Sequence, residues 1–131
     1  MTVALVIVSH SVKLADGVVE LAEQMARDVP LRAAAGTGDG RIGASFDKVN
    51  DAVTELRLAG HDVVILTDLG SATMTVESVL DFLDADEQEH VRFADGPLVE
   101  GAVAAAVTAQ VGGTLEAVAQ AALARELFAS G

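Results

Sequence analysis

The sequence predicts a single α/β domain over residues 1–131, with a doubly wound sheet of mainly parallel strands in the order 2-1-3-4 and helices on both faces. Short apolar runs alternate with segments whose apolar residues recur at helical spacing, which is typical of parallel strands joined by crossover helices. The runs at 3–8 and 63–66 are purely apolar and suit the centre of a sheet, whereas those at 31–35 and 91–94 each contain an arginine and suit its edges.

The first half of the chain contains two strand–helix units. Between the strands at 3–8 and 31–35, apolar residues at helical spacing predict an amphipathic helix. The second strand leads into a glycine-rich loop at 36–43, and Ser45 is then the expected N-cap of a second helix that ends at 59–60. The inward residues of the two helices are Leu14, Val18, Leu21, Ala22 and Met25, and Phe46, Val49, Val53 and Leu56.

The second half continues the same alternation. The strand at 63–66 is followed by a helix that leads to an acidic turn at 84–87 and then to the strand at 91–94. A proline in the first turn opens a helix over 97–110, and a last helix is expected over 115–128 after a Gly-Gly break. The inward residues of the third helix are Val76, Val79, Leu80 and Leu83.

Charge and composition exclude several classes of partner. The formal net charge is -12 and the isoelectric point about 4.3, which argues against binding to nucleic acid or to an anionic membrane surface. The chain contains no cysteine and only three histidines, so neither a disulfide framework nor a metal site is expected. No stretch resembles a signal peptide or a transmembrane helix, and we expect a cytoplasmic protein.

Polar residues follow both central strands at their carboxyl ends. His10, flanked by Ser9 and Ser11, comes after the first strand, and Asp68 comes after the third. In the order 2-1-3-4 the chain changes direction across the sheet between these strands, which opens a crevice where ligands commonly bind. We expect Asp68 to accept the Nδ1 proton of His10, so that Nε2 is free to act as a nucleophile.

The loops at 36–38 and 70–72, which follow the second and third strands, bring backbone N–H groups and hydroxyls to the same crevice. Such groups favour the binding of phosphoryl oxygens. The sequence therefore predicts a phosphohistidine at His10. His61 and His90 lie in turns away from the crevice and are interpreted as surface residues. The expected phosphate-binding residues are Ser9, Ser11, Gly36, Thr37, Gly38, Gly70, Ser71 and Ala72.

Four motifs, at 8–11, 40–48, 65–72 and 97–102, occur together in this order. Through them essentially the whole chain resembles the phosphocarrier subunits of phosphoenolpyruvate-dependent, or PTS-dependent, dihydroxyacetone kinases. The domain that defines these subunits is similar to the mannose-family enzyme IIA of the sugar phosphotransferase system (PTS). Ala44 and Thr75 depart from this pattern, because a threonine and an asparagine are expected there.

The resemblance implies that His10 receives phosphate from the histidine-containing phosphocarrier protein and passes it to ADP on a kinase subunit. A third subunit would hold dihydroxyacetone, and this chain would bind no cofactor itself. The alternative within the same chemistry is an enzyme IIA component of a mannose-type sugar permease. The motifs at 46–48 and 70–72 favour the dihydroxyacetone kinase over this alternative. A receiver-type module would need acidic residues after the first strand to hold magnesium, and 9–11 supplies none.

The helix at 97–110 also predicts a homodimer. Its segment 101–107 is apolar on every side, and a helix without a polar face must be buried all round. A domain of this size can cover one face of the helix with its own sheet, so we expect a second subunit to cover the other.

Overall fold

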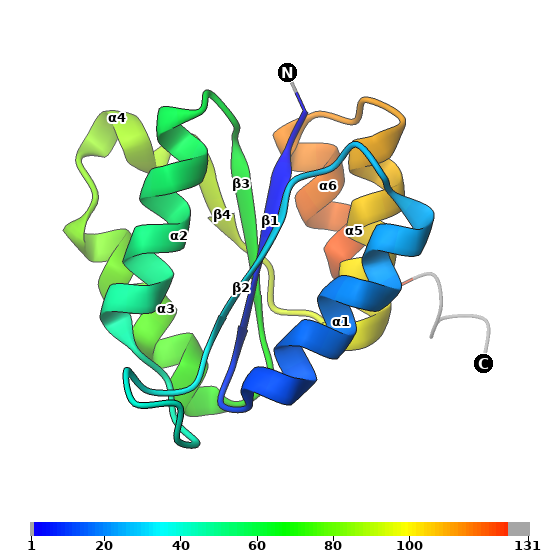
Figure 1. Cartoon of the computed structure of the whole chain (residues 1–131). Coiled ribbons are helices and arrows are strands. Elements are labelled where there is room, and N and C mark those ends of the chain that lie inside the picture. The colour runs from blue at the N-terminus through cyan, green and yellow to red at the C-terminus, as the bar shows by residue number, and fades with distance from the viewer. Residues whose placement is uncertain (1, 126–131) are drawn as a thin grey trace.

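Four parallel strands form the centre of the computed structural model, which describes residues 2–125 (Figure 1). Their order is β2-β1-β3-β4, which confirms the predicted arrangement. The strands are β1 (Ala4–Ser9), β2 (Leu31–Ala35), β3 (Val63–Thr67) and β4 (Val91–Phe93).

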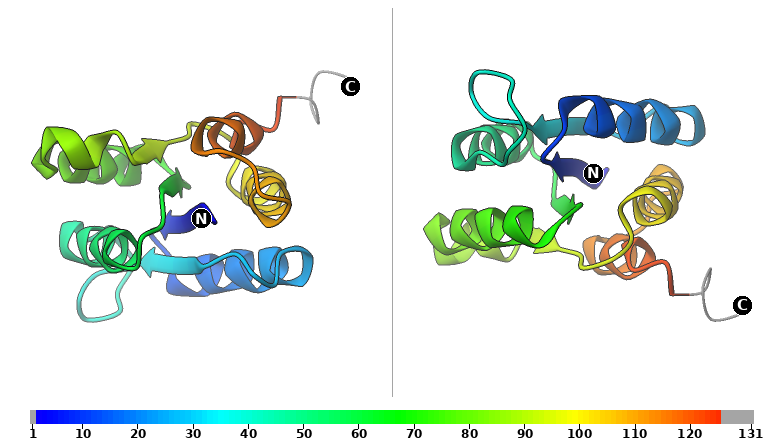
Figure 2. Two further views of the ribbon diagram at one scale, coloured as in Figure 1. Left: turned by 90° about the horizontal axis from the view of Figure 1, so that it is seen from above. Right: turned by 90° about the horizontal axis from the view of Figure 1, so that it is seen from below.

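Helices cover both faces of this sheet, as Figure 2 shows. One face carries α1 (Val12–Met25), α5 (Leu98–Gln110) and α6 (Leu115–Ala122). The other face carries α2 (Phe46–Leu58) and α3 (Gly70–Phe82). The acidic turn contains a further short helix, α4 (Ala85–Gln88). The last helix was expected to reach Phe128, which lies outside the described residues, and its described part ends at Ala122.

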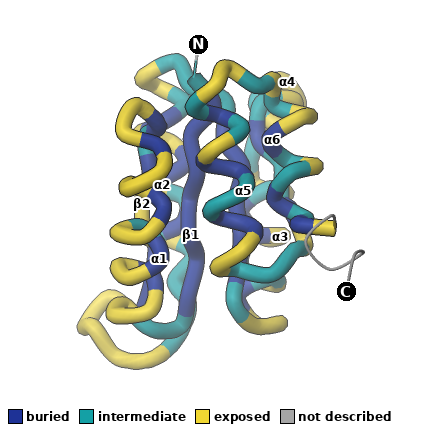
Figure 3. Tube along the Cα trace, turned by 90° about the vertical axis from the view of Figure 1, so that its right-hand side faces the viewer, coloured by how far each residue is buried: buried dark blue, intermediate teal, exposed yellow. Residues whose placement is uncertain are grey.

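β1 is the buried centre of the sheet, and all six of its residues are 0% exposed. Leu5 and Ile7 pack against the α1, α5 and α6 side, whereas Val6 and Val8 pack against the α2 and α3 side. Figure 3 shows this strand buried along its length. Because apolar cores lie on both of its faces, the strand has no position for an alternating polar residue.

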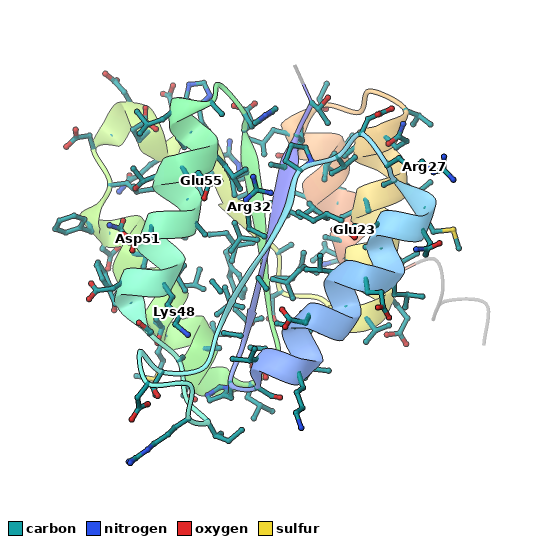
Figure 4. The ribbon with its side chains drawn as sticks, in the orientation of Figure 1. Glu23, Arg27, Arg32, Lys48, Asp51 and Glu55 are labelled. Atoms are coloured by element: carbon teal, nitrogen blue, oxygen red, sulfur yellow. The ribbon has the colours of Figure 1, made fainter. Side chains whose placement is uncertain are left out.

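Two basic side chains, Arg32 of β2 and Lys48 of α2, protect the β2 edge of the sheet. Arg32 donates to the carbonyl of Leu31, and Lys48 donates to the carbonyl of Ala35 at 2.7 Å. Arg32 also pairs with Glu55 of α2, and Figure 4 labels these side chains along the exposed edge of β2. Basic side chains that occupy edge carbonyls hinder the addition of a further strand.

The chain covers α5 with its own helices. Five residues of α5 are buried, and the helix packs against α1, α6 and β1, while Val99, Glu100 and Val107 remain exposed. The approach of α6 is close, since a Cβ atom added to Gly101 would lie 2.3 Å from the carbonyl oxygen of Ala122. α1 and α6 therefore cover part of the surface of α5, and Val99 and Val107 stay exposed, so coverage by a second subunit stays a prediction.

Within residues 2–125, the structure contains no helix long and apolar enough to cross a membrane.

Candidate active site

His10 and Asp68 follow neighbouring strands at the same edge of the sheet. β1 and β3 pair in parallel with Val8 opposite Thr67, so the residues just beyond these strands lie side by side. The imidazole Nδ1 of His10 is 2.9 Å from Oδ1 of Asp68, and the His10 backbone N–H donates to Oδ2 at 3.0 Å. The structure thus brings together the two residues expected to face each other across the crevice. Their side chains are 16% and 11% exposed, so both are largely shielded from solvent.

The Asp68 carboxylate accepts hydrogen bonds from every side. Besides His10, Ser9 Oγ donates to Oδ2 at 2.8 Å and the Leu69 backbone N–H donates to Oδ1 at 2.7 Å. Burial alone would raise the pKa of Asp68, but hydrogen bonds from His10, Ser9 and Leu69 outweigh burial and hold this pKa below its ordinary value. Asp68 is therefore an anion at neutral pH, and it favours the His10 tautomer that carries its proton on Nδ1.

The other ring nitrogen, Nε2, faces the beginning of α3. Ser71, in the first turn of that helix, forms a short hydrogen bond through Oγ to Nε2. Leu69 occupies the N-cap position and provides no side-chain acceptor. In the described part of the chain, the exposed backbone N–H groups of Gly70 and Ser71 have no hydrogen-bond partner. A helix start with free N–H groups attracts an anion, so a phosphoryl group on Nε2 would meet suitable donors.

The glycine-rich loop holds the backbone around His10. Gly36 is buried, and its N–H donates to the Ser9 carbonyl at 3.1 Å, while Gly43 donates to the His10 carbonyl at 3.0 Å. The Thr37 N–H is bonded to the Arg41 carbonyl at 2.9 Å. Gly36 has a φ of +71°, and a Cβ atom there would come within 2.9 Å of Val12, so only glycine fits.

These contacts divide the predicted phosphate-binding residues into two groups. The Gly36 and Thr37 N–H groups and the Ser9 and Ser11 hydroxyls already bond within the protein, with Ser11 capping α1 through the Leu14 N–H. Ala72 belongs to the same group, because it is buried and its N–H donates to the Leu69 carbonyl at 3.0 Å. The second group comprises the exposed residues Gly38, Gly70 and Ser71, of which Ser71 contacts Nε2. The sequence pattern located the loops correctly, but it could not reveal which of their donors were already engaged.

Two features of the site were missed in the sequence. Leu69 occupies an N-cap position, where Ser, Thr, Asp or Asn is usual. A leucine there indicates, from the sequence alone, that no side chain caps the first N–H groups of the helix. Exposed apolar side chains also flank the site, with Ile42, Leu69 and Met74 at 76%, 62% and 70% exposure. Thr75, one of the departures from the resembled pattern, donates to the Ser71 carbonyl at 3.1 Å and so holds the first turn of α3.

The remaining histidines lie at the amino end of the sheet. His61 Nδ1 is 2.8 Å from the Thr2 carbonyl oxygen, and His90 Nδ1 is 2.8 Å from Asp62 Oδ1. Both have intermediate exposure and are hydrogen-bonded, and both lie at the end of the sheet opposite His10, as their interpretation as residues away from the crevice predicts. Residues 2–125 contain no group of three or more acidic, histidine or cysteine side chains that could hold a metal ion.

The chain has clear relatives among known proteins. It is 37% identical over 119 residues to the phosphoryl donor subunit DhaM of PEP-dependent dihydroxyacetone kinase 2 from Listeria innocua, covering 90% of this chain and 94% of that one. It is 41% identical over 118 residues to the DhaM subunit from Providencia stuartii, but spans only 24% of that longer protein.

The structural comparison agrees with the sequence comparison. The crystal structure of a protein described as of unknown function superposes on this chain with a TM-score of 0.86, at 36% identity and over 95% of both chains. A family model described as PTS system fructose IIA component, EIIA-man, matches residues 4–119. These findings confirm the resemblance carried by the four sequence motifs. The chain belongs to the EIIA-man family.

Proposed function

We propose that this chain is the phosphoryl donor subunit of a PEP-dependent dihydroxyacetone kinase and that it carries the phosphoryl group on Nε2 of His10. The observation that supports this most directly is the pair of contacts on the His10 ring. Asp68 engages Nδ1, while Nε2 faces the open start of α3. The relatives favour this role, because those from Listeria innocua and Providencia stuartii are named as such subunits.

Loading of His10 requires no proton transfer. The lone pair of Nε2 attacks the phosphorus atom of a phosphohistidine on the incoming phosphocarrier protein, and a new N–P bond forms. The N–P bond of the donor breaks, and its electron pair returns to the donor imidazole. The His10 ring keeps its Nδ1 proton and becomes cationic, a charge that the Asp68 carboxylate stabilises at 2.9 Å.

Ser71 changes partner during this step. Before loading, its hydroxyl is hydrogen-bonded to Nε2, whose lone pair must be released for the attack. As the N–P bond forms, the hydroxyl turns to donate to a phosphoryl oxygen, and the N–H groups of Gly70 and Ser71 bind the developing negative charge.

In the second transfer His10 is the phosphoryl donor and ADP is the acceptor. A terminal phosphate oxygen of ADP on the kinase subunit attacks the phosphorus, the Nε2–P bond breaks, and its electron pair returns to His10, so that ATP is formed. Since ADP is held by the partner, this chain needs no cofactor of its own. A cytoplasmic location is part of this proposal, because it is where ADP and the phosphocarrier protein would be met. A homodimer stays a prediction, since α1 and α6 cover α5 in part and leave Val99 and Val107 exposed.

The experiment is incubation of the purified chain with phosphoenolpyruvate, enzyme I and the phosphocarrier protein, followed by addition of the ADP-loaded kinase subunit. We expect an acid-labile, base-stable phosphoryl group that His10→Ala abolishes and that His61→Ala and His90→Ala retain. The phosphoryl group should then be transferred from His10 to ADP. Passage to the IIB component of a sugar permease, with none to ADP, would favour the alternative role in sugar transport.

A further inference from the structure

Ser9 is a buried hydroxyl beneath the candidate active site. It is the last residue of β1 and is 0% exposed, and with Thr67 it is one of two buried polar residues in the described part of the chain. Its hydroxyl donates to Asp68 Oδ2 at 2.8 Å and accepts the Ser11 backbone N–H at 3.0 Å. A hydroxyl has only one proton to donate, so this group is fully committed inside the protein.

We propose that Ser9 is a positioning residue, which orients the Asp68 carboxylate so that Asp68 in turn orients the His10 ring. This inference rests on the proposed function and replaces the expectation that Ser9 binds phosphate. A phosphoryl group arriving from outside has no access to a fully buried hydroxyl, and contact with it would break the bond to Asp68.

The geometry explains how Ser9 acts at a distance from the reacting nitrogen. Oδ2 of Asp68 is held by Ser9 Oγ and by the His10 backbone N–H, while Oδ1 receives the His10 ring. The carboxylate is planar, so fixing Oδ2 also fixes the direction in which Oδ1 points. Without the Ser9 hydroxyl, Oδ2 keeps the backbone N–H alone, and the carboxylate gains freedom to rotate away from Nδ1.

Ser9 also stabilises the charge of Asp68. Its hydroxyl donates to the ionised carboxylate, and it is among the hydrogen bonds that lower the Asp68 pKa. Removal of this donor therefore raises the pKa of Asp68. The proportion of protein with an ionised Asp68 then begins to fall at a higher pH than in the wild type.

The test compares three variants. Ser9→Ala removes the hydroxyl, and Ser9→Thr keeps a hydroxyl at the same position. Thr67→Val is the matched control, because it deletes the other buried hydroxyl, at the end of the neighbouring central strand, where it contacts Thr73 Oγ1 at 2.9 Å instead of Asp68. Thermal unfolding of each variant establishes that it is folded.

For Ser9→Ala we expect phosphoryl uptake by His10 to slow about tenfold, within the range for a lost hydrogen bond to a charged group. The midpoint of the Asp68 carboxyl titration, followed by NMR, should move to higher pH. Ser9→Thr should restore both properties, and Thr67→Val should leave both unchanged. An unchanged rate and Asp68 titration in Ser9→Ala, or equal losses of rate in Ser9→Ala and Thr67→Val, would overturn the proposal.

A second measurement needs no phosphoryl transfer. Nitrogen NMR of histidine-labelled protein gives the fraction of His10 with its proton on Nδ1. We expect this fraction to fall in Ser9→Ala alone, and a fraction equal to that of the wild type would count against the positioning role. If the wild type itself accepts no phosphate, the proposed function fails, and the NMR comparison still decides the role of Ser9.

Discussion

At the scale of single residues, Asp68 sets the state of the reacting histidine. Its carboxylate bonds both the ring and the backbone of His10, at 2.9 and 3.0 Å, so it fixes the tautomer and the orientation together. We expect Asp68→Ala to slow phosphoryl uptake about 10–100-fold, which corresponds to losing a hydrogen bond to a charged group worth about 1.5–3 kcal/mol. Uptake should not vanish, because Nε2 remains present. Rapid-quench measurement of labelled His10 tests this, and an unchanged rate would remove Asp68 from the mechanism.

The lowered pKa of Asp68 gives a second prediction at this scale. In the unfolded chain the pKa of an aspartate carboxyl is about 3.9, and in the folded protein the pKa of Asp68 is lower. Ionised Asp68 therefore stabilises the folded state fully above the unfolded pKa, and this stabilisation is lost as pH falls through the folded pKa. The difference in unfolding free energy between the wild type and Asp68→Ala should therefore be largest near neutral pH and shrink below about pH 4. Urea unfolding across this range checks it, and a difference that grew on acidification would contradict the assignment.

At the scale of elements, α3 combines a structural weakness with a binding capacity. Its N-cap is Leu69, whereas Ser11, Ser45 and Thr114 cap α1, α2 and α6 through side-chain oxygens. We expect Leu69→Asn to be about 1 kcal/mol more stable than Leu69→Ala, because the amide oxygen can bond a free N–H group of the first turn. Phosphoryl uptake should be slower in the asparagine variant, since that N–H is then occupied. Thermal unfolding and uptake rates together test this, and equal uptake by the two variants would argue against a role for the helix start.

The elements of the fold differ in how far the local sequence predicts them. Uninterrupted apolar runs and edge arginines were sufficient for the strand order, and polar residues after the two central strands were sufficient to pair His10 with Asp68. The covering of α5 was missed, because it depends on Gly101 approaching α6 closely, a contact between segments that no local pattern encodes. The short helix α4 was missed for a similar reason, since Gln88 holds it through the carbonyls of Leu80 and Leu83.

At the scale of the whole molecule, the charge is distributed unevenly around the site. The chain carries a formal net charge of -12, yet the segments that flank His10 contain few ionisable groups. Residues 11–14, 36–45 and 69–75 hold Lys13, Asp39 and Arg41 as their only charged side chains. The exposed apolar residues Ile42, Leu69 and Met74 lie in the same segments. A docked partner therefore meets a surface that is apolar and nearly neutral, while the acidic residues act on it from further away.

This distribution of charge predicts that salt changes the association rate with the kinase subunit more than it changes the dissociation rate. The distant acidic residues attract a basic partner surface over many ångströms, and salt shortens that reach as the Debye length falls from roughly 10 Å at 0.1 M to about 3 Å at 1 M. Contacts of the docked complex involve the near-neutral segments around His10, and apolar contacts are not screened. Stopped-flow measurement with the ADP-loaded kinase subunit should therefore show an association rate that falls as sodium chloride rises and a dissociation rate that stays nearly constant. A dissociation rate that rose steeply with salt would place ion pairs within the docked interface and contradict this assignment of the acidic residues to long-range attraction.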